Sequence, residues 1–454
     1  MAIETINPST GELLAAYEET SPDEVKALLN AVDRAFAAWS QTDIEQRGRL
    51  LHRAADVLRR RGGEYSALMA REMGKPLFQG KAEVEKSAWV CEYYATHGSD
   101  FLADQSVATD ATRSYVSFRP LGTVLAVMPW NFPFWQVFRF AAPALMAGNT
   151  GVLKHASNVT GCALAIEEVF REAGMPADVF RTLVIGAGRV RSVIEAPQIK
   201  AVTLTGSGPA GRAVAAAAGA ALKKTVLELG GSDPYVVLED ANLDETVDTC
   251  VTSRLINSGQ SCIAAKRFIV VASIKEAFER RYVEVMRDKT MGDPFGAVDV
   301  GPLARRDLRD ELHQQVVGSV ERGARLLLGG TVPDGPGAFY PPTVLADERP
   351  GMPAYDDELF GPVAAVIEAR DETEAVRIAN DSAFGLGAAV FTSDAERGER
   401  IARDRLHAGA CFVNAFVKSD PRLPFGGIKD SGYGRELAAF GIREFVNIKA
   451  VYVK

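Results

Sequence analysis

Hydrophobic and polar residues alternate with two different periods along this chain of 454 residues. The N-terminal part repeats apolar positions at helical spacing, most clearly over 21–40, where Ser21 precedes Pro22 and Glu24. A serine followed three residues later by glutamate forms a capping box, and proline is favoured in the first helical turn. The pattern therefore predicts a helix that begins after Ser21, with more amphipathic helix through 45–100 and a break at Gly62-Gly63.

The period changes near residue 114. A strand-rich run over 114–130 leads into short apolar strands that alternate with helices from about 140 to 230. A second alternating region covers about 232–415, and the chain ends in a strand-like segment over 443–454. Alternation of this kind indicates βαβ units and parallel sheets, so we expect an α/β fold.

Length and composition limit the class of protein. A chain this long is expected to form two or three domains. Its net charge of -8 argues against a nucleic-acid surface, and no apolar run is long enough to cross a membrane. The five cysteines are widely spaced with no C-x-x-C pair, which disfavours a disulfide framework or a zinc site and fits a reducing compartment. No signal peptide is visible, so we expect a cytoplasmic protein. From the charge, the apolar runs and the cysteine spacing together, we expect no nucleic-acid partner, no membrane partner and no bound metal.

A glycine-rich stretch, Gly206-Ser-Gly-Pro-Ala-Gly211, follows an apolar strand and spells G-x-G-x-x-G. Such a turn lets the backbone approach a dinucleotide pyrophosphate, and a later acidic residue holds the ribose. Glu228 has a suitable spacing for that role. It also ends an apolar strand beside Gly230, where burial would raise its pKa and make it a general base. A third interpretation is a solvated carboxylate at a strand end.

Cys262 is the strongest candidate for a nucleophile. It follows the small and polar run Ser258-Gly-Gln-Ser261, in which glycine admits a substrate and a backbone N–H can donate to an oxyanion. The alternative is a small buried hydrophobe, which describes most cysteines. The other four cysteines lie in helical or strand patterns. Of the histidines, His155 alone lies in a distinctive position, which weakens a cysteine-protease interpretation.

Asn131 lies in a second distinctive stretch, MPWNFPFWQVFRF over 128–140. Prolines and aromatic residues make such a loop rigid, so its asparagine amide can donate to an oxyanion; an asparagine that only forms a turn is the alternative. Arg139 follows in an aromatic context. Its cation either reaches solvent or binds an anion.

Six short blocks, taken together and in order, resemble the aldehyde dehydrogenase superfamily over essentially the whole chain. The resemblance implies a Rossmann-like cofactor domain (1–109 and 123–227), an α/β catalytic domain (228–432) and a small β oligomerisation flap (110–122 and 433–454), assembled as a homodimer or homotetramer. The blocks are PWNFP (129–133), LTGS with Gly211 (204–211), LELGGSDP (227–234), NSGQSC (257–262), ELFGPV (358–363) and PFGGIKDSGYGRE (424–436).

By this resemblance, Cys262 attacks the aldehyde carbon to form a thiohemiacetal, whose oxyanion is held by Asn131 and the Cys262 backbone N–H. A hydride passes to the nicotinamide, and water activated by Glu228 hydrolyses the thioester. Glu358 and Phe360 are expected to position the nicotinamide ribose, and Lys154 to contact the adenine-side ribose. The full set of expected cofactor residues is Trp130, Lys154, Ser157, Gly206, Ser207, Glu358 and Phe360.

Two positions depart from the family pattern. Ser232 replaces the lysine of the usual LELGGK block, a cation to which we assign a structural role. Ser157 stands where many NAD-preferring members have a glutamate that bonds the ribose hydroxyls. A glutamate would repel a 2′-phosphate, whereas a serine can donate to one. We therefore expect NADP to be the preferred cofactor, with NAD also accepted.

The substrate prediction comes from the KHASNVTGCA block, Ser232 and the short chain, which together resemble the shorter bacterial branch of succinate-semialdehyde dehydrogenases. Such a substrate carries a carboxylate remote from its aldehyde and calls for a cation and a hydroxyl in the pocket. Arg139 and Ser419 match these roles, and Trp135 and Ser261 complete the expected substrate site.

Other functions stay open at this stage. Within the superfamily, the substrate can be another aliphatic or aromatic aldehyde, or the thioester can be released to coenzyme A. Some relatives have a second cysteine two residues after the nucleophile, and here Ala264 removes that redox switch. Outside the superfamily, Cys262 can serve an acyl-transferase or hydrolase without a nicotinamide. A non-enzymatic binding protein would be expected to lack the nucleophile or the base, and both are present.

Overall fold

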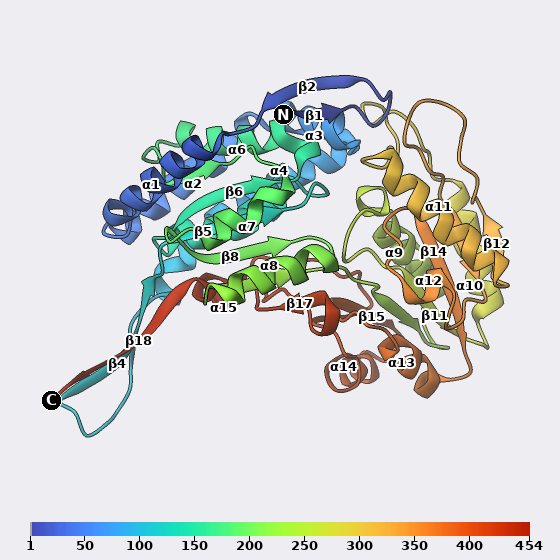
Figure 1. Cartoon of the computed structure of the whole chain (residues 1–454). Coiled ribbons are helices and arrows are strands. Elements are labelled where there is room, and N and C mark those ends of the chain that lie inside the picture. Colours follow the sequence, from blue (N-terminus) through green and yellow to red (C-terminus); the bar gives the residue numbers. More distant parts are fainter. Residues whose placement is uncertain (1) are drawn as a thin grey trace.

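Two large sheets dominate the structure, a computed structural model that describes residues 2–454 (Figure 1). The first is parallel except where its short edge strand β17 pairs antiparallel with β9. In spatial order its strands are β17 (Gly432–Tyr433), β9 (Lys224–Glu228), β8 (Ile199–Thr205), β5 (Thr123–Met128), β6 (Thr150–His155) and β7 (Phe180–Thr182).

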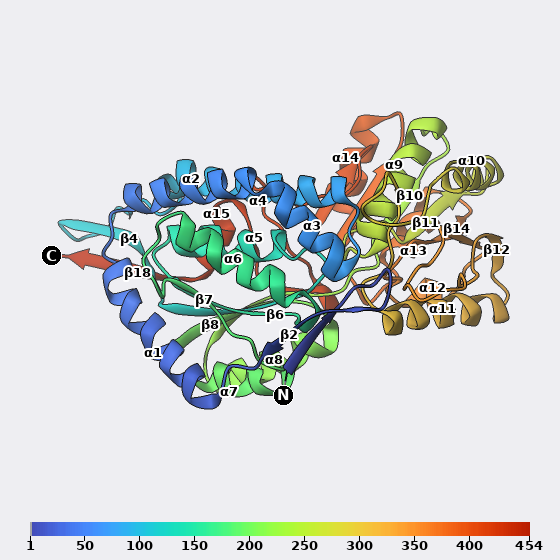
Figure 2. The same ribbon diagram turned by 90° about the horizontal axis from the view of Figure 1, so that it is seen from above.

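Helices cover both faces of this sheet (Figure 2). Successive residues of β5 point to opposite faces, so Val124 and Ala126 join one hydrophobic cluster and Leu125 joins another. On one face lie α5 (Trp135–Met146) and α6 (Thr160–Glu172), with α2 (Ile44–Arg60), α3 (Gly62–Met73) and α4 (Leu77–Phe101) outside them; on the other lie α1 (Pro22–Trp39), α7 (Val190–Glu195) and α8 (Gly208–Ala220).

The N-terminal helices follow the predicted pattern closely. The capping box before α1 is confirmed, since Ser21 Oγ accepts from the Glu24 backbone N–H and Glu24 Oε2 accepts from that of Ser21. The stretch predicted over 45–100 is helical; its predicted break falls directly before Gly62-Gly63, and the structure adds a second break. Arg61 separates α2 from α3, and Gly74, in the left-handed region at φ 77°, ends α3.

The second sheet is also parallel except at one edge, where β12 pairs antiparallel with β13. Alternation again divides its side chains between two hydrophobic clusters, under α9 and α10 on one face and α13 and α14 on the other. Its strands, in spatial order, are β12 (Arg325–Leu328), β13 (Thr343–Ala346), β14 (Val363–Ala369), β11 (Arg267–Val271), β10 (Pro234–Val237), β15 (Gly387–Phe391) and β16 (Ala410–Val413); its helices are α9 (Leu243–Leu255), α10 (Lys275–Arg287), α11 (Arg306–Glu321), α12 (Pro353–Asp356), α13 (Glu372–Asn380) and α14 (Ala395–Asp404).

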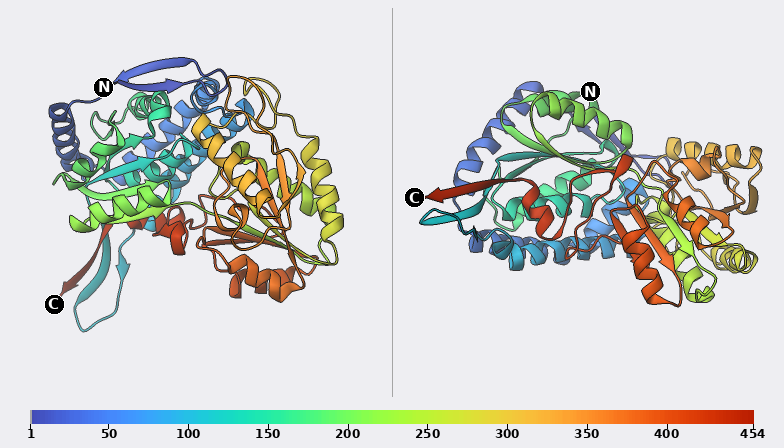
Figure 3. Two further views of the ribbon diagram at one scale, coloured as in Figure 1. Left: turned by 45° about the vertical axis from the view of Figure 1, so that its right-hand side comes forward. Right: turned by 90° about the horizontal axis from the view of Figure 1, so that it is seen from below.

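An antiparallel arm projects from the body of the molecule and carries the C-terminus near its tip (Figures 1 and 3). It consists of β18 (Val446–Val453), β4 (Arg113–Pro120) and β3 (Gln105–Ser106), in that order. The strand predicted over 443–454 is β18. The preceding helix α15 (Ala438–Glu444) packs against α4 and α5. A separate hairpin of β1 (Ala2–Ile6) and β2 (Leu13–Glu18) opens the described chain.

The carboxyl ends of the strands of the first sheet face the amino ends of the strands of the second sheet, and this arrangement positions the site. Parallel strands end together, so the residues after β5, β6, β8 and β9 share the carboxyl edge of the first sheet. The chain passes from β9 through 229–233 into β10, and therefore enters the amino edge of the second sheet. The segment before β11, which contains Cys262, lies at that same amino edge. Within residues 2–454, none of the helices combines the length and apolar character needed to cross a membrane.

Candidate active site

A pocket of about 870 Å³ lies between helices α4 and α5 and the segment that precedes β11. It brings Cys262 together with all four residues predicted for the substrate, Trp135, Arg139, Ser261 and Ser419. The residues predicted for the cofactor lie outside its lining. The five cysteines are free, and residues 2–454 contain no group of three or more His, Cys, Asp or Glu side chains placed to hold a metal ion.

The backbone before Cys262 is strained. Asn257, Ser258 and Gly259 have φ values of 53°, 56° and 77°, three consecutive residues in the left-handed region inside the short 3-10 helix η3 (Ile256–Gly259). Such conformations persist only where the surrounding structure enforces them, and they concentrate at functional sites. A Cβ at Gly259 would lie 2.2 Å from the backbone of Gly361, so no larger residue fits.

Two buried cations hold this segment in place. The Arg254 Nη2 donates to the carbonyl of Gly259 at 2.7 Å. The Lys266 Nζ donates to the carbonyls of Ser261 at 2.8 Å and Cys262 at 2.7 Å, and lies 3.3 Å from Glu358 Oε1. Lys266 thus connects the nucleophile segment to a predicted cofactor residue. Sequence reasoning missed Lys266, because nothing in the local pattern shows that its side chain turns back on the loop.

Asn131 lies against the same segment from the first sheet. Its side-chain Nδ2 donates to the backbone carbonyl of Gln260 at 3.2 Å. The backbone carbonyl of Asn131 accepts from Asn257 Nδ2 at 2.7 Å and from Lys75 Nζ at 2.9 Å. The side chain is buried. These contacts fix Asn131 beside the Cys262 loop, so an amide donor and a thiol from different sheets occupy one site.

Burial controls the protonation of Cys262. Desolvation, with the nearby negative charge of Glu228 as a second cause, raises the pKa of the thiol to about 12, and the cations of Lys266 and Arg139 oppose this shift. The free protein therefore holds Cys262 as a thiol at neutral pH. A proton acceptor is needed before the sulfur can act as a nucleophile.

Glu228 belongs to a buried charge cluster with Arg139 and Glu436. The Arg139 Nε lies 2.5 Å from Glu436 Oε2, while its Nη2 lies 3.6 Å from Glu228 Oε2 and donates to Thr205 Oγ1 at 3.2 Å. Glu228 is only 2% exposed, which excludes a solvated strand-end carboxylate. Burial raises the pKa of Glu228, the charge of Glu436 adds to this rise, and Arg139 opposes it. Such a carboxylate is a stronger base than one in water.

The contacts of this cluster bear on two sequence-based interpretations, those of Glu228 and Arg139. Glu228 is enclosed with Arg139 and is not free to hold a ribose. Arg139 lines the pocket, and its guanidinium is shared by two carboxylates, which its sequence context did not indicate. Glu436 was missed although it ends the PFGGIKDSGYGRE block, because its partner Arg139 lies far away in the sequence.

The residues predicted for the cofactor follow the carboxyl edge of the first sheet. Lys154 is the next-to-last residue of β6, and its buried side chain makes no hydrogen bond or ion pair within residues 2–454. Ser157 is exposed in the 3-10 helix η1 (Ser157–Val159) that comes next. Gly206 follows β8, and Ser207 is the N-cap of α8, where its side chain makes no capping bond. An unpaired buried cation and an open helix N-terminus suit an anionic ligand.

The remaining residues predicted for the cofactor are two aromatic residues and a carboxylate. The rings of Trp130 and Phe360 meet edge to face with centroids 5.7 Å apart. Glu358 Oε1 accepts from the Gly231 backbone N–H at 3.0 Å. In the GSGPAG stretch, a Cβ at Gly208 would meet nothing within 4 Å, whereas one at Gly211 would lie 2.5 Å from Leu229. The middle glycine of the G-x-G-x-x-G spelling is therefore not required by packing.

Comparison with known proteins identifies the family. The model for the "Aldehyde dehydrogenase family" matches residues 1–451. The chain is 51% identical over 455 residues to a Synechocystis protein named "Probable succinate-semialdehyde dehydrogenase", with NADP(+) in its name, and covers all of it. It is 47% identical over 449 residues to an Escherichia coli succinate semialdehyde dehydrogenase named for NAD(P)+, covering 99% of this chain and 97% of the other.

A solved structure agrees over the full length. The crystal structure of succinic semialdehyde dehydrogenase from Streptococcus pyogenes, in complex with NADP+ as the cofactor, superposes with a TM-score of 0.97 at 37% identity and covers 100% of both chains. The α/β fold expected from the sequence is confirmed. The six sequence blocks occur in the family's order, the two sheets meet at Cys262, and the matches cover the full length. The chain therefore belongs to the aldehyde dehydrogenase family.

Proposed function

We propose that the protein oxidises succinate semialdehyde to succinate, with NADP as the preferred cofactor and NAD as an alternative. One observation carries this proposal: Cys262 opens into a pocket that also contains a cation and a hydroxyl, Arg139 and Ser419. The full-length relatives named as succinate-semialdehyde dehydrogenases support it.

The chemistry at Cys262 begins when the thiol gives up its proton to solvent water and its sulfur attacks the aldehyde carbon. A C–S bond forms and the carbonyl electron pair moves to oxygen, to which Asn131 Nδ2 and the Cys262 backbone N–H donate in this proposal. The nicotinamide, when bound, supplies the acceptor for the hydride that leaves this carbon. Cys262 then carries a thioester, and Glu228 takes a proton from the attacking water as the C–S bond breaks and the carboxylic acid is released.

The cofactor residues fit an NADP-like ligand. Lys154 is a buried cation without a partner in residues 2–454, and burial lowers its pKa, so an anion beside it restores the charge. Ser157, three residues after Lys154, has an uncharged hydroxyl that would not repel a 2′-phosphate. Ser207 and the α8 N-terminus suit the pyrophosphate. Trp130, Gly206, Glu358 and Phe360 complete the proposed cofactor site.

The substrate residues suit a short chain with a terminal carboxylate. Arg139 Nη1 makes no hydrogen bond within residues 2–454, so this end of the guanidinium is available to a ligand. Ser419 Oγ accepts from Trp135 Nε1 at 3.1 Å and can still donate its own proton to a carboxylate. Ser261, next to the nucleophile, also lines the pocket.

Assembly and location are further parts of the proposal. The projecting arm of β18, β4 and β3 supports a homodimer or homotetramer, because it exposes large apolar side chains to solvent. The free cysteines support a cytoplasmic location, where thiols stay reduced.

An activity panel tests the function. Succinate semialdehyde, glutarate semialdehyde, an uncharged aliphatic aldehyde and an aromatic aldehyde are each assayed with NADP and with NAD, following absorbance of the reduced cofactor. We expect the largest kcat/KM for succinate semialdehyde with NADP. Turnover without nicotinamide, or the same kcat/KM for every aldehyde, contradicts the proposal.

A single substitution tests the assigned base. In Glu228→Gln, sulfur attack and hydride loss remain but thioester hydrolysis lacks its base, so we expect a burst of reduced cofactor of about one per active site, followed by a steady state slowed by roughly 10²- to 10⁴-fold. Rapid-mixing absorbance measures both phases. Cys262→Ala, as the control, gives neither. A Glu228→Gln enzyme with an undiminished steady state would remove Glu228 from the mechanism.

A further inference from the structure

Lys86 of α4 lines the same pocket, and no local sequence pattern marks this position. Its Nζ donates to Ser419 Oγ at 2.9 Å and lies 4.1 Å from the centre of the Trp135 ring. Ser419 Oγ thus accepts hydrogen bonds from both Lys86 and Trp135. The ammonium group therefore contacts two of the residues proposed to bind the substrate.

The negative charges around this pocket are engaged elsewhere. Glu83 binds Lys75 and accepts from the backbone N–H groups of Phe134 at 2.8 Å and Trp135 at 3.0 Å. Glu85, one residue before Lys86, binds Arg59 at 2.8 Å. Both carboxylates lie on the same helix as Lys86, and each has another cation as its partner.

The remaining carboxylates of the pocket are paired as well. Asp420 binds Arg422 at 2.7 Å, and Asp299 lies 3.7 Å from Lys289. Within residues 2–454, Lys86 forms no ion pair with any acidic side chain. The other pocket cation without an ion pair, Lys418, is exposed to solvent, which screens its charge.

Lys86 also faces a second cation. Burial, followed by the positive charge of Arg139, lowers the pKa of Lys86 to about 7. Two cations that line one largely dehydrated pocket repel each other, and an anion between them relieves both the repulsion and the lost hydration.

We propose that Lys86 is a specificity-determining residue that, with Ser419, binds the carboxylate at the far end of the aldehyde substrate opposite Arg139. This inference rests on the proposed function and adds the cation that completes its anion site. An uncharged aldehyde leaves the Lys86 ammonium unpaired and displaces water from it, so Lys86 discriminates against neutral substrates as well as favouring charged ones.

A charge-only substitution tests the inference. Lys86→Gln keeps a donor for Ser419 but removes the charge, Lys86→Arg keeps the charge, and Lys81→Gln changes an exposed lysine of the same helix that does not line the pocket. For each protein, kcat/KM is measured with succinate semialdehyde and with its methyl ester, which has the same aldehyde chain without the charge. We expect Lys86→Gln to lower the ratio of the two values by roughly 10- to 100-fold. The ratio should stay within about threefold of the unaltered protein in Lys86→Arg and unchanged in Lys81→Gln.

The outcomes separate this inference from the proposed function. If the unaltered protein itself shows no preference for succinate semialdehyde over the ester, the proposed substrate is wrong. If it shows the preference and Lys86→Gln retains it, the role of Lys86 is wrong. Activity of Lys86→Gln toward the ester reports that the variant is folded.

The unaltered protein provides a second test that needs no substitution. The groups facing Lys86 are Glu83 on its own helix, Arg139 on α5, and Lys418 and Asp420 in the segment before Phe425. As pH rises through about 7, Lys86 loses its proton, so the ratio of kcat/KM for acid over ester should fall, while effects of Cys262 and Glu228 cancel in the ratio. Lys86→Arg should abolish this fall. A ratio that stays constant from pH 6 to about 9 in the unaltered protein overturns the inference.

Discussion

Burial raises the pKa values of two residues in the site, and the two rises have opposite consequences for reactivity. Desolvation raises the pKa values of both Cys262 and Glu228. For the thiol this makes the nucleophile inactive until a base takes its proton, whereas for the carboxylate it makes a stronger base. Arg139 limits the rise at both groups, so one buried guanidinium adjusts nucleophile and base together.

At the cofactor edge, a single exposed serine is expected to determine preference. In Ser157→Glu, the new carboxylate repels a 2′-phosphate, so the Kd for NADPH should rise by roughly 10- to 100-fold, while the Kd for NADH changes little or falls. Titration monitored by nucleotide fluorescence measures both constants.

Ser157→Gln is the matched control, because it has the size of glutamate without the charge. It should weaken NADPH binding far less than Ser157→Glu. Equal losses in the two variants would indicate that bulk, rather than charge, sets the preference.

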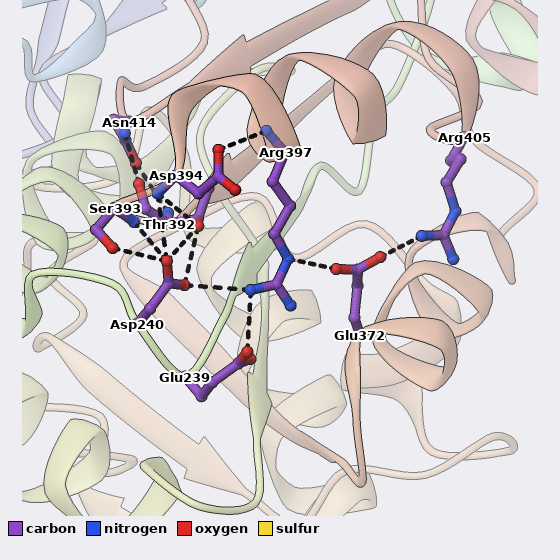
Figure 4. Close-up of polar contacts among 9 residues, drawn as sticks. All are labelled: Glu239, Asp240, Glu372, Thr392, Ser393, Asp394, Arg397, Arg405 and Asn414. Atoms are coloured by element: carbon purple, nitrogen blue, oxygen red, sulfur yellow. Dashed lines mark hydrogen bonds and ion pairs between the residues drawn. The ribbon is translucent and has the colours of Figure 1, made fainter.

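Among the elements, α13 and α14 are held to the second sheet by one polar network near the carboxyl ends of β10 and β15 (Figure 4). Asp240, just after β10, accepts from Thr392 Oγ1 at 2.8 Å and from the Ser393 N–H at 3.0 Å and Oγ at 2.7 Å, where β15 ends. Arg397 on α14 lies 3.6 Å from Asp240 and 2.6 Å from Glu372 on α13. The carboxylate therefore joins two strand ends and a helix start.

Removing the charge at this junction should destabilise the fold without changing catalysis. Asp240→Asn weakens several hydrogen bonds to a carboxylate, so we expect the free energy of unfolding to fall by about 1–2 kcal/mol. Denaturant unfolding measures this change, and kcat/KM should be unaltered.

The neighbouring Glu239→Gln provides the comparison. Glu239 is about half exposed and binds only Arg397, at 2.9 Å, among residues 2–454, so its loss should cost at most about 1 kcal/mol. An effect of Glu239→Gln equal to that of Asp240→Asn would contradict the assignment of the junction to Asp240.

For the molecule as a whole, the projecting arm of β18, β4 and β3 exposes apolar side chains that no other part of residues 2–454 covers. Ile448 and Tyr452 of β18 are 61% and 54% exposed, and with Ala450 they lie on one face of the strand, since alternate residues share a side. Large apolar side chains in a projecting sheet are typical of a subunit interface.

Charges on that face should dissociate the proposed oligomer. In the double variant Ile448→Glu and Tyr452→Glu, light scattering after size exclusion should give the monomer mass of 48.8 kDa, in place of a multiple of it. Lys449→Glu, on the opposite face of β18, should keep the assembled mass. A double variant with unchanged mass would exclude this face of the arm as the interface.

Local pattern alone determined a large part of this description. The alternation of strand and helix predicted two α/β regions, because hydrophobic period depends on near neighbours in the chain. Cys262, Asn131 and Glu228 were selected from short blocks, since a nucleophile loop or a strand-end carboxylate needs particular residue types at fixed spacing. Family membership followed from the order of those blocks.

The tertiary structure alone decided which charges meet. Arg139 pairs with Glu436, Lys266 turns back on the carbonyls of Ser261 and Cys262, and Lys86 reaches Ser419 from 333 residues away. No local spacing encodes such pairs, because they form only when the two sheets and the C-terminal segment pack together. Burial, which sets the pKa of each of these groups, is likewise a property of the packed molecule and not of any segment.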